Sequence, residues 1–151
     1  MGWWPFSRGD VLIQLPKYNY SPGEIITGTI TIKLKKPIHA NSVNVRLLGE
    51  ELVTQRMGGK TSTMTNTIFD FDQPLDGEKD YPPKTPLTYN FQIQIPSNIG
   101  QQPIENETLK TVVGVAQALG GTRKRIKWTL IGRLDIPGAI DLRKRIQVNI
   151  A

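Results

Sequence analysis

The chain has 151 residues and no cysteine, which excludes disulfide bonds, thiol nucleophiles and thiolate metal sites. Hydrophobic residues make up 38% and charged residues 21%, a balance typical of a soluble globular protein and not of a disordered or membrane-embedded one. The formal net charge is +6. Such a charge attracts acidic partners if the basic residues cluster, and otherwise serves solubility.

The length fits a single core, so we expect residues 1–151 to form one domain. No apolar run approaches the roughly 20 residues of a membrane-spanning helix. The first ten residues lack the basic-then-apolar layout of a secretory signal, because Pro5, Ser7 and Arg8 interrupt them. These patterns predict a cytoplasmic location.

The first expected strands lie near the front of the chain, at residues 11–15 and 26–35. Pro22 and Gly23 form a turn between them, and residues 26–35 then alternate apolar residues or glycine with Thr and Lys. Strict period two predicts a strand with one face on a core and the other in water.

Residues 43–50 alternate in the same way, and only Leu48 interrupts their polar face. Gly58 and Gly59 predict a hairpin turn that leads into a Thr-rich strand at residues 61–71. Three further alternating runs follow, at residues 87–95, 126–136 and 146–150.

One segment has a different periodicity. Between Pro103 and Gly121 apolar residues recur at helical spacing, which predicts a short amphipathic helix, with a strand or an irregular loop as the alternative.

Seven one-sided strands exclude a parallel sheet, which needs strands buried on both faces. We therefore predict an all-β fold, an immunoglobulin-like sandwich of two antiparallel sheets with one short helix. Its expected core is Ile26, Ile30, Ile32, Val45, Leu47, Tyr89, Phe91, Ile93, Trp128, Leu130, Leu134, Ile146 and Val148.

The sequence contains few candidate catalytic residues. The single histidine, His39, lies in a predicted connection, and no serine or carboxylate has a motif relation to it. The acidic segment at residues 70–80 lacks the ligand spacing of a calcium-binding loop, so we interpret it as a solvated loop. We expect no catalytic residue, no metal site and no cofactor.

Two basic runs are candidates for a binding face, at residues 123–127 and 143–145. If their strands are neighbours, Lys127, Arg133, Arg143 and Arg145 line one solvent face. Aromatic side chains that stack nucleic-acid bases are missing from these runs, because Trp128 is predicted to point inward. The candidate binding residues are Arg123, Lys124, Arg125, Lys127, Arg143, Lys144 and Arg145.

Several of these segments resemble the arrestin-like N-terminal domain. The resemblance rests on the Pro22-Gly-Glu turn followed by Gly28, the strand from Val43 to Gly49, the strand ending at Pro96, and the segment from Trp128 to Pro137. The chain is similar to single arrestin-type domains of sporulation-control-like proteins and of the arrestin-like retromer subunit. The resemblance implies a two-sheet sandwich that acts as an adaptor or scaffold.

The first strand lacks the paired lysines with which receptor-binding arrestins take phosphates, so receptor desensitisation is not implied. We therefore expect a non-catalytic domain that binds a protein partner whose identity the sequence does not reveal. The alternative is a binder of anionic ligands, an acidic lipid surface or nucleic acid, through the basic face. Sequence-specific nucleic-acid recognition is not expected, and a sheet edge could serve self-association.

Overall fold

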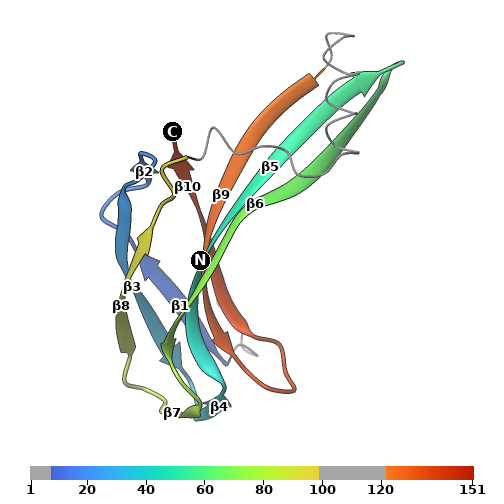
Figure 1. The fold of residues 1–151 in the computed structure, drawn as a ribbon. Coiled ribbons are helices and arrows are strands. Elements are labelled where there is room, and N and C mark those ends of the chain that lie inside the picture. Colours follow the sequence, from blue (N-terminus) through green and yellow to red (C-terminus); the bar gives the residue numbers. More distant parts are fainter. Residues whose placement is uncertain (1–7, 99–121) are drawn as a thin grey trace.

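Ten strands make up the regular structure of the computed structural model, which describes residues 8–98 and 122–151. Figure 1 shows how they are arranged. In chain order they are β1 (Gly9–Gln14), β2 (Asn19–Tyr20), β3 (Ile25–Leu34), β4 (Ile38–Ala40), β5 (Ser42–Met57), β6 (Lys60–Asp76), β7 (Lys79–Tyr81), β8 (Leu87–Gln94), β9 (Thr122–Asp135) and β10 (Leu142–Ile150).

These strands form two main sheets and one small one. The order is β1-β3-β8 in the three-stranded sheet, β2-β10-β9-β5-β6 in the five-stranded sheet and β4-β7 in the two-stranded sheet. All pairs are antiparallel except β2 with β10, which pairs in parallel over two residues. The predicted all-β sandwich is therefore confirmed. The expected helix falls on residues 103–121, outside the described part of the chain.

The core lies between the two main sheets and is built from the alternating apolar residues of each strand. Most of the predicted core is buried, including Ile26, Leu47 and Trp128. Two members of the prediction are wrong. Tyr89 is only half-buried and packs against the core cluster, and its hydroxyl donates a hydrogen bond to Asp76 Oδ2 at 2.7 Å. Ile146 is also half-buried and does not belong to the core cluster.

Glycine turns fix the register at two places. At Pro22-Gly23, Gly23 has φ +85°, and the Glu24 amide donates to the Ser21 carbonyl at 3.0 Å, which is the geometry of a type II turn. Gly58 and Gly59 both have positive φ, 56° and 80°, and join β5 to β6 as the two-residue hairpin that the sequence predicts.

Strands β5, β6 and β9 are longer than the sequence patterns predict. Their distal ends form a three-stranded projection beyond the rest of the sandwich (Figure 1). Because β9 is paired with β5 on one side and β10 on the other, its solvent-facing residues lie in the middle of a broad sheet surface. No helix within residues 8–98 or 122–151 has the length and apolar character needed to cross a membrane.

Candidate functional site

The candidate site is the solvent-facing side of the five-stranded sheet, which we call the outer face. Residues directly opposite each other in paired strands share a face. Ile131 of β9 lies opposite Arg46 of β5 and Arg145 of β10, and Lys127 lies opposite Glu50. The sequence prediction that Lys127, Arg133, Arg143 and Arg145 share a face is therefore confirmed by the strand register.

A groove of about 400 Å³ runs along the outer face over β5, β9 and β10. Its cationic lining residues are Arg46, Lys127, Arg133, Arg143 and Arg145. Two carboxylates, Glu50 and Asp72, and two aliphatic residues, Leu48 and Ile131, also line it. Cations therefore predominate in the groove, and the apolar residues lie among them.

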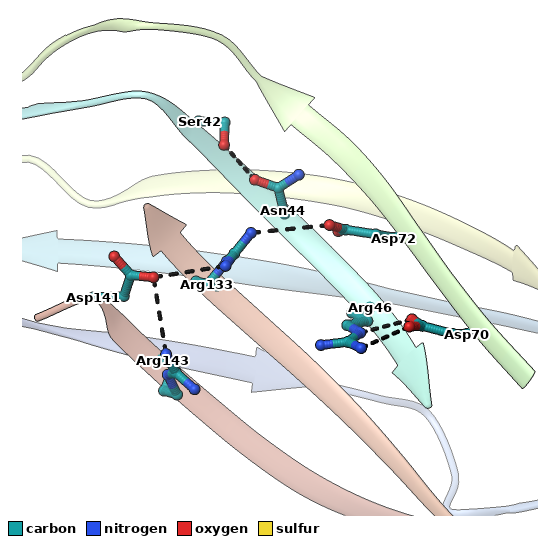
Figure 2. Close-up of polar contacts among 8 residues, drawn as sticks. All are labelled: Ser42, Asn44, Arg46, Asp70, Asp72, Arg133, Asp141 and Arg143. Carbon is teal, nitrogen blue, oxygen red and sulfur yellow. Dashed lines mark hydrogen bonds and ion pairs between the residues drawn. The ribbon is translucent and has the colours of Figure 1, made fainter. Parts of the chain in front are cut away.

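Arg46 is held by a bidentate pair. Its Nε and Nη2 donate to the two carboxylate oxygens of Asp70 at 2.7 and 2.6 Å (Figure 2). Hydrogen bonding from Arg46 lowers the pKa of Asp70, and the same bonds raise the pKa of Arg46. This cation is already matched within the chain, so it shapes the groove and is less available to a ligand.

A second set of ion pairs crosses from β6 to β10. Arg133 lies 3.9 Å from Asp72 and 3.6 Å from Asp141, and Asp141 also lies 3.8 Å from Arg143 (Figure 2). Asp141 accepts a hydrogen bond from the Ile136 amide at 2.9 Å, which fixes the carboxylate at the end of β9. Asp141 thus positions both arginines at one end of the groove.

Lys127 and Arg145 differ from the other cations of the groove. Both side chains are exposed, and neither forms an ion pair with another residue in the described ranges 8–98 and 122–151. Their charges are therefore available to an anionic group that enters the groove.

The other predicted basic residues are placed elsewhere. Arg123, Lys124 and Arg125 lie further along β9 and border a separate groove of about 440 Å³ near Leu52. Lys124 occupies the alternate position of the strand, and its Nζ lies 3.8 Å from Glu51. Lys144 pairs with Gly132, which faces the core side of the sheet, so it does not share the outer face.

Sequence reasoning missed the partners of these cations. Asp70, Asp72 and Asp141 come from β6 and from the connection before β10, far from their arginines in the chain. The one feature of the sequence that pointed to this groove is Leu48, an aliphatic residue on the otherwise polar face of residues 43–50. The structure places it in the floor of the groove.

His39 lies at a different place, on the small β4-β7 sheet, and is exposed. Its Nδ1 lies 2.7 Å from Asp80 Oδ1 and its Nε2 lies 3.0 Å from Glu78 Oε2. A ring that donates to two carboxylates must carry both protons, so the hydrogen bonds with Glu78 and then Asp80 raise the pKa of His39. The predicted lone loop histidine is therefore a strand residue with two acidic partners.

The raised pKa predicts a pH dependence of stability. A folded-state pKa above the unfolded value of about 6.5 contributes stability that is fully present below pH 6.5 and is lost as pH rises through the folded pKa. Ring-proton NMR of this single histidine should give a midpoint above 6.5, and the His39→Gln variant should lose that part of the pH dependence of unfolding. A midpoint at or below 6.5 contradicts the two contacts.

The arrangement offers non-covalent recognition through charge and apolar contact. Across residues 8–98 and 122–151, no cluster of histidine and carboxylate side chains has the arrangement of a metal site. The cations that line the outer face attract acidic groups electrostatically.

Comparison with known proteins agrees with the fold. The family model described as "Arrestin (or S-antigen), N-terminal domain" matches residues 9–107. The crystal structure of Spo0M, a sporulation control protein from Bacillus subtilis, superposes with a TM-score of 0.65 at 19% identity. That alignment covers 96% of this chain and 50% of the Spo0M chain, so the chain spans about half of that structure. No curated protein matched. The family match covers more than half of the sequence, and the chain belongs to the arrestin N-terminal domain family.

Proposed function

We propose that this domain is a non-catalytic adaptor whose outer face binds an acidic segment of a protein partner. The family match supports a general adaptor-type role, because arrestin-like domains generally bind other proteins and are non-catalytic. The observation that carries the proposal is the pair Lys127 and Arg145, two cations on one groove without an ionic partner among the described residues.

The alternative ligands, an acidic lipid surface or a nucleic acid, fit this face less well. Glu50 and Asp72 line the same groove and would repel a continuous run of phosphates. No aromatic side chain lines the groove to stack bases. A short segment with a few carboxylates can meet the two unpaired cations and avoid the acidic residues.

Reversing the two unpaired cations should weaken recognition without unfolding the domain. The variant Lys127→Glu/Arg145→Glu should bind a short labelled peptide of alternating Glu and Ser about tenfold more weakly, as read by fluorescence anisotropy. Each exposed ion pair contributes roughly 0.2 to 1 kcal/mol, and reversal replaces two attractions with two repulsions. Added salt should weaken native binding, because exposed charges are screened over about 8 Å at physiological ionic strength.

The matched control reverses two cations away from the outer face. Lys33→Glu/Lys144→Glu changes the net charge by the same amount, so equal losses in the two variants would mean that only the overall charge matters. Anionic vesicles and a single-stranded oligonucleotide serve as competing probes. Tighter binding of either probe, with the same dependence on Lys127 and Arg145, would overturn the proposal in favour of that ligand.

A further inference from the structure

The outer face has an apolar floor beneath its cations. Ile131 is only 9% exposed although it lies on the solvent side of β9. Arg46 and Arg145 lie directly opposite it on the two neighbouring strands, so their aliphatic stems flank the isoleucine. Leu48 is half-buried in the same groove and lies opposite Thr129. These two aliphatic residues add apolar contact area to a surface that would otherwise bind through charge alone.

Along the groove, the two unpaired cations Lys127 and Arg145 lie on either side of Leu48. Along β9 the groove has three successive levels on one face, which are Lys127 beside Glu50, then Thr129 beside Leu48, then Ile131 between Arg46 and Arg145. Same-face residues of a strand are about 6.6 Å apart, and alternate side chains of an extended peptide have the same spacing. An extended segment along β9 can therefore place three alternate side chains at these three levels.

The charge distribution selects the chemistry of that segment. The first and third levels carry Lys127 and Arg145, which are cationic and unpaired among the described residues, whereas the middle level carries Leu48. On the opposite side of the groove, the lining carboxylates Glu50 of β5 and Asp72 of β6 repel acidic groups and keep them toward β9 and β10. Carboxylates therefore fit the two outer levels, and an aliphatic side chain fits the middle one.

We infer that the groove binds an extended partner segment of the pattern acidic–x–aliphatic–x–acidic. The inference rests on the proposed function and adds the aliphatic anchor, its position and its contact with Leu48. It also gives a role to Leu48, which interrupts the polar face within residues 43–50 and lies level with Thr129, between the two unpaired cations.

The test compares two labelled peptides on the full chain, Glu-Ser-Leu-Ser-Glu and Glu-Ser-Ser-Ser-Glu, by fluorescence anisotropy at low salt. The leucine peptide should bind about tenfold more tightly, which corresponds to about 1.4 kcal/mol. The Leu48→Thr variant should bind both peptides equally, with the affinity that the native protein has for the serine peptide. Threonine is well tolerated in strands, so this variant should keep its fold.

Leu52→Thr is the matched control, because Leu52 lies on the same face of β5 but borders the separate groove near Arg125. It should keep the preference for leucine. If both peptides bind equally to the native protein and still require Lys127 and Arg145, the aliphatic anchor is refuted while the proposed acidic recognition stands. Binding of neither peptide, or binding that ignores the Lys127→Glu/Arg145→Glu reversal, refutes both. A loss of preference in Leu52→Thr equal to that in Leu48→Thr also overturns the assigned position.

Discussion

Replacing Trp128 with alanine should lower the free energy of unfolding by about 3 to 5 kcal/mol, because the lost ring leaves a cavity that the core fills only in part. Trp128 is 1% exposed and belongs to the core cluster. Its ring centroid lies 5.9 Å from that of Phe69, and its edge lies against Gly49. Urea unfolding followed by far-ultraviolet circular dichroism measures the loss.

Trp128→Phe is the control for this experiment. The Trp128 Nε1 is buried and has no hydrogen-bond partner in the part of the chain that the structure describes. Phenylalanine therefore removes no hydrogen bond and keeps an aromatic contact with Phe69, so we expect less than half of the alanine loss. A loss below about 1 kcal/mol for Trp128→Ala would contradict a core position for the ring.

The sandwich could be predicted because a strand with one buried face repeats every two residues. The run from Ile26 to Leu34 shows this pattern clearly, and its apolar members are buried in β3. The Gly58-Gly59 hairpin was predictable for a related reason. Two adjacent glycines supply the positive φ that a two-residue turn between strands requires, and few other residues do.

The short strands could not be predicted. β2 has two residues and β4 and β7 have three each, too few for any periodicity to be read. Partner strands distant in sequence define them, as β7 does for β4. The extension of β5 to Met57 was missed because Glu51 interrupts the alternation, and only pairing with strands on both sides stabilises this segment.

For the candidate site, the sequence could predict only which residues of one strand share a face. Arg143 and Arg145 lie two residues apart on one strand, so they had to share a face, and the neighbouring strand then supplied Lys127. The same rule could have removed Lys124 and Lys144 from the candidate set, because they occupy the alternate positions. The ion pairs of Arg46 with Asp70 and of Arg133 with Asp72 depend on strand order, which no local pattern encodes.

The acidic partners of His39 were missed for the same reason. Glu78 and Asp80 are about forty positions away in the chain, and only the pairing of β4 with β7 brings them to the ring. Strand pairing also explains why residue 49 is a glycine. In the sequence it is only one of the alternating positions of residues 43–50. Across the β5–β9 ladder Gly49 lies directly opposite Trp128, and its lack of a side chain makes room for the indole.

Gly49→Ala should therefore destabilise the domain by about 1 to 3 kcal/mol, the usual cost of overpacking a core. A Cβ at this position would lie 2.5 Å from Trp128 Cζ3 and 2.7 Å from Cη2, so the ring must move. Gly49 does not have a positive φ, so alanine brings no backbone strain, and its lower unfolded-state entropy offsets only part of the clash. Urea unfolding measures the change, and Gly77→Ala, where a Cβ meets nothing within 4 Å, should stay within about 0.5 kcal/mol of the native protein.

A double-mutant cycle with Trp128→Ala separates the clash from any effect of the backbone. In the Trp128→Ala background the ring is gone, so the added Cβ of Gly49→Ala has space and should cost almost nothing. The two substitutions should then be non-additive, with a coupling free energy of about 1 to 3 kcal/mol. If Gly49→Ala costs the same in both backgrounds, its effect arises in the backbone of β5, and the glycine is not there to accommodate the indole of Trp128.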